Sequence, residues 1–434
     1  MTSKHVLRKL LAGGPSAGAD GPLRLQYLRE VSCLLWPRPV AVSIDGHGTG
    51  TGNTDGDTGG DNRPGASGRD FVLVPSAARP RLLVPAHSRR VAAAAVGRYA
   101  EPRSRRGRAR ARLLDLSLAS GIGMALMRER VRVRVPPGAE TIETYLRDAL
   151  GRDLSVSMHI GPARANRKPV LQLLSPSGET IGFAKVGVNT LTGDLVRAER
   201  DSLAVLRAAR LRTARVPAVL HHGVWNGMDI LVQSALPVWL PRERLGSSRL
   251  TAAMREVAEV EGTPTCALEA SPYWTALDDR LAHLHRDDNA HTLRRAAEHV
   301  GRQAGRTQLA FGAWHGDWTP WNMATLPDTL LVWDWERFGR GVPLGFDALH
   351  YHLQSAVVRG RRDPELAVGD TLRESAALLS PFGAGAEVAR LTCLLYLIDL
   401  ATRYLTDGQA EAGARLGILG SWLLPVLVAE VERL

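Results

Sequence analysis

The sequence of 434 residues is poor in cysteine, and its apolar runs are short. The cysteines are scattered, odd in number and without the spacing of a metal site, which favours a reducing compartment; they are Cys33, Cys266 and Cys393. The apolar stretch Leu391 to Ala401 is too short to cross a bilayer and is interrupted by Asp399, so we expect no membrane span. The first eleven residues lack the apolar core of a secretion signal. We therefore expect a cytoplasmic protein.

Aromatic residues are scarce in the most basic part of the chain. Residues 79–134 contain fifteen Arg and three acidic residues, a net charge of +12, whereas the whole chain carries +11. Such a cluster could bind nucleic acid, anionic lipid or a polyanionic substrate. We favour the simpler interpretation, a solvated Arg-rich face in a chain rich in Ala, Arg and Gly. Tyr99 is the only aromatic residue among these arginines. Single-stranded nucleic acid is usually bound by stacking its bases on aromatic side chains, so this composition argues against such binding.

Large apolar side chains are absent from residues 45–69, which contain nine glycines together with Asp, Thr, Asn and Ser. This composition predicts a flexible linker behind an N-terminal arm, residues 1–44. Residues 70–150 then predict an α+β extension packed on the next lobe. It would contain a hairpin at 71–74 and 81–84, helices near 88–99, 107–127 and 140–150, and a strand at 131–135.

The most informative segment is His315-Gly-Asp-Trp-Thr-Pro-Trp-Asn322, followed by Asp334 after the apolar run Leu330 to Trp333. Phosphoryl transfer requires a carboxylate that orients the attacking hydroxyl. It also requires an amide oxygen and a second carboxylate that hold magnesium against the nucleotide phosphates. Asp317, Asn322 and Asp334 supply these groups in that order. Both aspartates could instead cap turns, but four ordered positions make this alternative weak.

This pattern resembles the aminoglycoside phosphotransferase family and its small-molecule kinase relatives, which share the protein-kinase fold. The resemblance covers residues 153–434 and is sharpest at 314–350. It implies a bilobal α+β fold, with a small antiparallel β-sheet lobe at 151–236 and a mainly helical lobe at 237–434. The N-terminal α+β extension precedes these lobes. The resemblance also implies that Asp317 accepts the proton of the acceptor hydroxyl, that His315 braces the loop, and that Asn322 and Asp334 bind Mg²⁺.

A nucleotide-binding lobe is indicated upstream by strands at 154–160, 170–174 and 181–186. Lys185 lies in the third of these strands, where a lysine is costly to desolvate unless it meets an anion. We expect it to contact the α- and β-phosphates of ATP, with Glu199 of a helix at 194–211 as its partner. The alternatives are an edge-strand lysine that faces water and a Glu199 paired with a neighbouring arginine.

The loop at 161–168 has one glycine, Gly161, in place of a Gly-x-Gly-x-x-Gly run. The side chains of Arg164, Arg167 and Lys168 could replace backbone amides as phosphate contacts, or they could form a solvated face. Residues 230–233 predict a strand, and the segment from Ser234 to Pro237 predicts the hinge that meets the adenine. Both Ser234 and Leu236 are therefore expected at the nucleotide.

The second lobe is predicted to be helical at 273–304, 344–360, 366–379, 385–405 and 409–434. Within it, Asp399 and Arg403 are expected to form an internal ion pair, and Asp347 to brace the catalytic segment. Trp314 and Trp333 are expected in the core, while Trp318 could line an acceptor site. No other metal-ligand residues accompany His350 and His352, which are interpreted as ordinary surface or packed histidines.

The sequence thus predicts an ATP- and Mg²⁺-dependent phosphotransferase that acts on a hydroxyl of a small molecule. A sugar, an amino sugar, an antibiotic or a small alcohol all remain open as acceptor. Two other classes stay possible: a catalytically silent kinase-like scaffold that binds a partner, and a nucleic-acid-associated protein that uses the arginine cluster. The sequence does not predict an oligomeric state.

Overall fold

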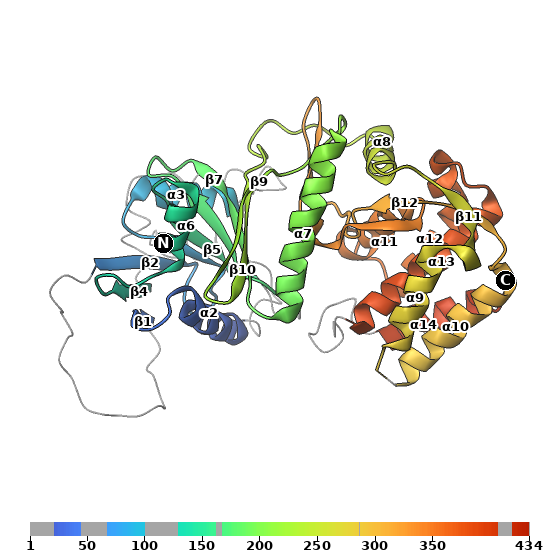
Figure 1. The fold of residues 1–434 in the computed structure, drawn as a ribbon, viewed down its shortest axis with the longest axis horizontal. Coiled ribbons are helices and arrows are strands. Elements are labelled where there is room, and N and C mark those ends of the chain that lie inside the picture. The colour runs from blue at the N-terminus through green and yellow to red at the C-terminus, as the bar shows by residue number, and fades with distance from the viewer. Residues whose placement is uncertain are drawn as a thin grey trace, which may run out of the picture. The chain divides into compact units, whose positions relative to one another are not determined.

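The computed structural model describes residues 21–44, 67–99, 129–161, 167–285, 287–406 and 419–433. The chain forms two compact units. The first comprises Met1–Ala163, Arg167–Gly193 and Val219–Ala235, and the second comprises Arg164–Asn166, Asp194–Ala218 and Leu236–Leu434. The first unit is built on an antiparallel sheet and the second is mainly helical (Figure 1), so the predicted α+β class is confirmed.

The first unit contains a nine-stranded sheet with the order β1-β4-β2-β3-β5-β6-β7-β10-β9. Its strands are β1 (Ala41–Ile44), β2 (Ser67–Val74), β3 (Leu82–Pro85), β4 (Arg130–Val135), β5 (Ser155–His159), β6 (Val170–Leu174), β7 (Thr180–Gly187), β9 (Val219–Trp225) and β10 (Met228–Ser234). Every neighbouring pair is antiparallel. Strand β3 pairs with β5 through Leu82↔His159 and Leu83↔Met158, so the sheet runs on from the N-terminal strands into the strands that follow residue 150.

Helices cover both faces of this sheet because its central strands bury side chains on both sides. In β2, Phe71 and Leu73 pack into one apolar cluster with α2 (Gly21–Leu35) and α6 (Ile142–Leu150). The alternate residues Val72 and Val74 pack into another cluster with α3 (Arg89–Tyr99). Successive side chains of a strand point to opposite faces of the sheet. Helices α2 and α6 therefore cover one face, and α3 covers the other.

The second unit is built around a helical core. Its helices are α7 (Thr190–Ala209, with residues 194–209 in this unit), α8 (Ser247–Ala258), α9 (Pro272–Ala282), α10 (Asp288–Ala304), α11 (Phe346–Gln354), α12 (Pro364–Leu379), α13 (Ala386–Thr406) and α14 (Leu419–Val431). Helix α13 is buried around much of its circumference and forms the centre of the apolar cluster. Such burial is typical of a central helix rather than an amphipathic surface helix.

Two small three-stranded sheets in the second unit support the predicted catalytic segment. One has the order β11-β12-β15 and the other β13-β14-β8. Their strands are β8 (Ala214–Arg215), β11 (Thr265–Ala267), β12 (Gln308–Trp314), β13 (Met323–Thr325), β14 (Leu330–Val332) and β15 (Gly339–Pro343). The segment from His315 to Asn322 joins β12 to β13, so both of its ends are held by strands.

Several predicted elements differ from those observed. The single helix expected at 273–304 is two helices, because Asp287 caps α10 by accepting a hydrogen bond from the backbone N–H of Ala290 at 2.7 Å. The helix expected at 344–360 is α11 followed by a π-helical turn, Ser355–Arg359. The predictions at 107–127 and 409–418 lie outside the described residues. In the part of the chain that is described, no helix has the length and apolar character needed to cross a bilayer.

Candidate active site

The loop that follows β12 is fixed around His315, whose side chain is fully buried. Its Nδ1 accepts a hydrogen bond from the backbone N–H of Asp317 at 3.1 Å. Its Nε2 therefore carries the proton and donates to the backbone carbonyl of Trp333 at 3.0 Å. Burial lowers the pKa of His315 below its usual value, which agrees with this neutral tautomer. His315 thus ties the loop to the end of β14, as its predicted bracing role requires.

Gly316 allows the loop to turn sharply. Its φ is +80°, and a Cβ at this position would lie 2.1 Å from the backbone oxygen of Arg337. Only glycine combines this backbone conformation with such a close approach. The turn leads the chain from the buried His315 to Asp317, whose side chain is 36% exposed.

The side chain of Asp347 holds the backbone of the same loop, which confirms the bracing role expected for Asp347. It lies in the first turn of α11, and its two oxygens accept hydrogen bonds from the N–H groups of His315 at 2.7 Å and Gly316 at 3.2 Å. Burial raises the pKa of Asp347 to about 7, although the two backbone hydrogen bonds oppose this shift. A buried carboxylate that accepts two backbone N–H groups holds the loop in one conformation.

Asn322 and Asp317 are brought into direct contact. The side-chain Nδ2 of Asn322 donates to the backbone oxygen of Asp317 at 3.0 Å and to its carboxylate Oδ2 at 2.9 Å. With Nδ2 used in this way, the amide Oδ1 of Asn322 is left to act as a metal ligand. The amide is largely buried, so its orientation is fixed by these contacts.

Asp334 follows the hairpin that β13 and β14 form. Met323 pairs with Val332 in this hairpin, and the backbone N–H of Trp333 donates to the carbonyl of Asn322 at 3.0 Å. Asp334 itself adopts a left-handed conformation, with φ 73° and ψ 53°, a rare conformation for a residue with a side chain. The strain is of the kind that concentrates at functional sites. The hairpin therefore places the predicted metal ligands Asn322 and Asp334 at its open end, one just before β13 and the other just after β14.

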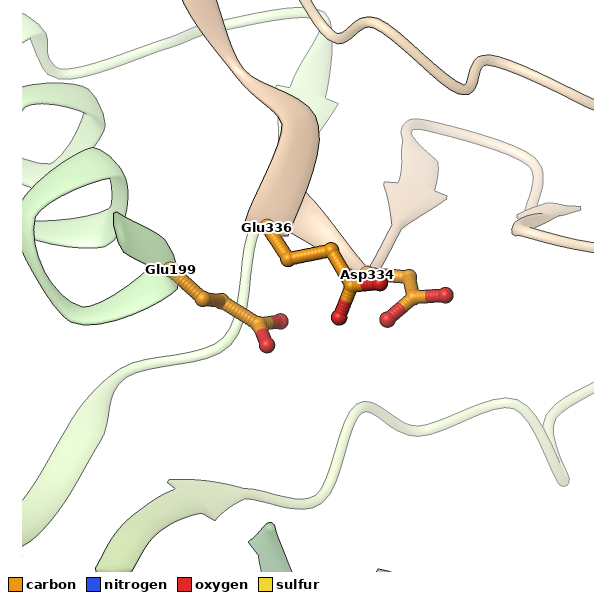
Figure 2. Close-up of side chains that lie close together, drawn as sticks. All are labelled: Glu199, Asp334 and Glu336. Atoms are coloured by element: carbon orange, nitrogen blue, oxygen red, sulfur yellow. The ribbon is translucent and has the colours of Figure 1, made fainter. Parts of the chain in front are cut away.

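Three acidic side chains of the second unit lie together at this point. Carboxylate oxygens of Glu199, Asp334 and Glu336 lie within 4.8 Å of one another (Figure 2). Glu199 reaches the group from α7, and it also accepts a hydrogen bond from the backbone N–H of Trp335 at 3.1 Å. Oxygen ligands of this kind suit a hard divalent cation such as Mg²⁺. The donor set thus fits the metal that the sequence predicts, and Glu336 is an acidic neighbour that the sequence reasoning did not single out.

The predicted nucleotide contacts are distributed over both units. Lys185 lies in β7, and its side chain is only 7% exposed. Its neighbours Ala184 and Val186 belong to the cluster of α2 and α6, so Lys185 points to the other face of the sheet. Because Lys185 belongs to the first unit and Glu199 to the second, their pairing stays a prediction.

The remaining nucleotide contacts are placed as follows. Gly161 follows β5, Lys168 precedes β6, and Ser234 is the last residue of β10, all in the first unit. Leu236 belongs to the second unit, where it is buried against the β13–β14 hairpin. Arg164 lies outside the described residues. The roles of these residues toward a nucleotide stay predictions.

Two residues near Asp317 were missed by the sequence reasoning. His350 was interpreted as an ordinary surface or packed histidine; it is packed, but its Nε2 also lies 3.1 Å from Asp317 Oδ1, a contact that was not expected. Arg403 was expected to pair with Asp399, but its guanidinium donates to the backbone oxygen of Gly316 at 2.5 Å. Asp399 instead contacts Arg280 of α9 at 2.5 Å. The only sequence signal was the position of His350 three residues after Asp347, which places both on one face of a helix.

The tryptophans near the loop pack more deeply than expected. Trp318 is fully buried and packs near His315 and Trp335, so it cannot form the wall of an acceptor site. Trp314 is buried as expected, whereas Trp333 is partly buried against the hairpin cluster. The aromatic side chains around the loop therefore stabilise its conformation.

No protein-family model matches the chain, and no curated protein matches it. Solved structures are similar to it. A thermostable mutant of aminoglycoside phosphotransferase APH(4)-Ia, bound to ADP and hygromycin B, is 14% identical with a TM-score of 0.45, over 67% of this chain and 98% of its own. Choline kinase LicA from Streptococcus pneumoniae is 13% identical with a TM-score of 0.43, over 68% of this chain and 99% of its own.

Amicoumacin kinase hAmiN, in complex with AMP-PNP, Ca²⁺ and Ami, is 12% identical with a TM-score of 0.41, over 67% of this chain and 92% of its own. By their names, the three are a phosphotransferase and two kinases. These TM-scores describe a distant likeness. The functional proposal for this chain therefore rests on its own residues.

Proposed function

We propose that the protein is an ATP- and Mg²⁺-dependent phosphotransferase that phosphorylates a hydroxyl group of a small molecule. The observation that carries this proposal is the contact between Asp317 and Asn322, together with the strand pair that links Asn322 to Asp334. Phosphoryl transfer needs few covalent steps from the protein and depends on positioning and charge, and these residues supply both.

In this proposal Asp317 is the catalytic base. Its exposed carboxylate orients the acceptor hydroxyl and accepts its proton as the oxygen attacks the γ-phosphorus of ATP. The bond from the γ-phosphorus to the bridging oxygen breaks, and ADP leaves. His315 holds the loop that carries this base, through its hydrogen bonds to Asp317 and Trp333.

Asn322 and Asp334 would hold Mg²⁺, which neutralises charge on the nucleotide phosphates when it is bound. Glu336 lies close enough to Asp334 to contribute to the same negative field. Lys185, with Glu199 as its partner, would contact the α- and β-phosphates. Gly161, Arg164 and Lys168 would meet the phosphates from the loop, while Ser234 and Leu236 would meet the adenine.

The first experiment tests metal-dependent nucleotide binding by thermal unfolding. ATP should raise the melting temperature when Mg²⁺ is present and have little effect without it, because a ligand that binds only the folded state stabilises it. Asp334→Ala should abolish the Mg²⁺-dependent part of the rise. Asp328→Ala is the matched control, because Asp328 is exposed in the turn of the same hairpin.

The outcome separates the proposal from its main rival. Equal stabilisation by ATP with and without Mg²⁺, unchanged in Asp334→Ala, would favour a catalytically silent scaffold. If binding requires Mg²⁺, a screen of sugars, amino sugars and small alcohols with ADP release as readout should identify the acceptor class.

A further inference from the structure

Helix α11 presents two side chains to the catalytic loop. Asp347 accepts hydrogen bonds from the backbone of His315 and Gly316, as described above. His350 lies three residues later, and so on the same face of the helix, and its Nε2 is 3.1 Å from Asp317 Oδ1. One helix face therefore holds both the backbone of the loop and the side chain of the proposed base.

Helix α13 adds a second pair of contacts to the same segment. Arg403 donates to the backbone oxygen of Gly316. The hydroxyl oxygen of Tyr396 lies 3.1 Å from Nδ1 of His350. Arg403 and Tyr396 are seven positions apart, which is about two helical turns and places them on one face. The side chains of His350 and Tyr396 are both fully buried.

The contacts of His350 determine its tautomer. An ionised Asp317 can only accept hydrogen bonds, so the Nε2 of His350 must carry the proton and donate to Oδ1. Its Nδ1 then accepts from the hydroxyl group of Tyr396. The nitrogen that faces Asp317, Nε2, is already protonated, and the lone pair of Nδ1 faces Tyr396. His350 therefore cannot take up the proton that Asp317 receives from the acceptor hydroxyl.

Both oxygens of Asp317 are thereby engaged. Oδ1 accepts from His350 and Oδ2 accepts from Asn322. Two donors on opposite oxygens fix the rotation of the carboxylate about its last torsion angle, which is otherwise broad. A base held in this way presents its remaining lone pairs in a single direction.

We propose that His350, held by Tyr396, is a positioning residue that fixes the orientation of the Asp317 carboxylate for proton abstraction from the acceptor hydroxyl. The proposal rests on the phosphotransferase function proposed above. It assigns His350 no contact with substrate and no part in moving the proton. Its effect should therefore fall on turnover and spare nucleotide binding.

The test compares two substitutions at position 350 by steady-state kinetics of Mg²⁺-dependent ADP formation, with an acceptor or with water as the acceptor. His350→Leu fills the site without a donor, and kcat should fall about 10- to 100-fold while the KM for ATP stays within about twofold. His350→Gln keeps an N–H donor in reach of Asp317 and should retain kcat within about threefold. His352→Leu, on the same helix but partly exposed beside Glu374, should leave both constants unchanged.

Thermal unfolding and ATP binding of each variant establish that it is folded. If folded His350→Leu turns over at the wild-type rate, His350 does not position the base and the proposal is overturned. A kcat that is equally low in His350→Gln and His350→Leu would also overturn it, because the donor would then be irrelevant.

A second measurement does not depend on activity. Nitrogen-15 NMR of labelled histidine should show His350 as the neutral tautomer protonated at Nε2, and Asp317→Ala should shift its signals. A tautomer protonated at Nδ1 would refute the inference directly. The predicted tautomer in a protein without any turnover would instead refute the phosphotransferase function, and with it a catalytic role for His350, while the hydrogen bond would stand.

Discussion

Each of the two units buries a carboxylate within a polar network, and the two networks end differently. In the first unit, Glu143 of α6 accepts from Trp36 Nε1 at 2.9 Å and pairs with Arg69 at 3.0 Å. Arg69 also donates to the hydroxyl group of Thr141 at 3.2 Å, and this hydroxyl accepts from the backbone N–H of Thr144 at 3.3 Å. We call Trp36, Arg69, Glu143 and Thr141 the Glu143 network. It joins the residue that follows α2 to β2 and to the first turn of α6, and its one carboxylate is buried.

In the second unit, Asp347 begins a network that continues to the surface. It holds the backbone of His315 and Gly316, and the chain of contacts then passes through Asp317 to Asn322 and His350. We call this the Asp347 network. Among these residues Asp317 has the exposed side chain, at 36%, whereas its neighbours in the network are buried. A buried network that includes an exposed reactive group is expected of an active site, whereas a network whose carboxylate is buried only stabilises the fold.

The largest effect should come from the exposed end of the Asp347 network. Asp317→Asn preserves the shape of the side chain but removes the proton acceptor, so kcat should fall roughly 100- to 10,000-fold. Steady-state ADP release measures this change, and Mg²⁺-dependent ATP binding should persist in the same preparation. Retained turnover would show that the base lies elsewhere and would remove the distinction between the two networks.

The buried end of the Asp347 network should affect both turnover and stability. Asp347→Leu leaves the N–H groups of His315 and Gly316 without their acceptor, which should lower the unfolding free energy by about 2–3 kcal/mol. The released loop should also lower kcat by about 10- to 100-fold. Denaturant unfolding and ADP release measure the two effects. Loss of stability with full turnover would mean that the loop keeps its geometry without Asp347.

The Glu143 network should affect stability alone. Glu143→Leu leaves the indole N–H of Trp36 without an acceptor and Arg69 without its carboxylate partner. The unfolding free energy of the first unit should therefore fall by about 2–3 kcal/mol. The exposed pair between Asp70 and Arg134 in the same sheet is the matched control, and Asp70→Asn should cost less than about 1 kcal/mol. Denaturant unfolding measures both variants. A fall in kcat for folded Glu143→Leu would show that this network reaches the reaction after all.

The sequence was sufficient to predict the parts of the site that are close in the chain. His315, Asp317 and Asn322 lie within eight residues, and the apolar run before Asp334 indicated the strand that brings it near Asn322. Asp347 could be predicted because the motif extends to it. The buried strands at 155–159, 170–174 and 180–187 also agreed with their apolar patterns, since period two and turn residues mark them clearly.

Contacts between distant helices could not be predicted in the same way. His350 meets Tyr396 across 46 positions, and Arg403 meets Gly316 across 87, so both contacts depend on how α11 and α13 pack. The local interpretation of Asp399 with Arg403 was wrong because Arg280, 119 positions away, is the partner that packing supplies. Spacing along one helix cannot show which neighbouring helix faces it.

The smallest expected effect concerns the pH dependence of stability in the Asp347 network. Burial lowers the pKa of His350 below 6.5, while contacts with Asp317 oppose this shift. Below pH 6.5 the unfolded chain therefore binds a proton that the folded chain does not. The unfolding free energy should consequently fall as the pH is lowered, by at most about 1.4 kcal/mol per pH unit for this one group.

His350→Gln removes that contribution, so its stability should fall less steeply than that of the wild type below pH 6.5. Asp347 acts with the opposite sign, because its pKa of about 7 exceeds the reference value of 3.8 and the folded state holds an extra proton between these values. Since Asp347 is present in both proteins, its contribution cancels in their difference. Denaturant unfolding from pH 5 to 8 measures that difference, with the exposed His291→Gln as control. Parallel curves for wild type and His350→Gln would mean that His350 gains a proton in the folded state as readily as in the unfolded chain, and that the Asp347 network does not keep it neutral.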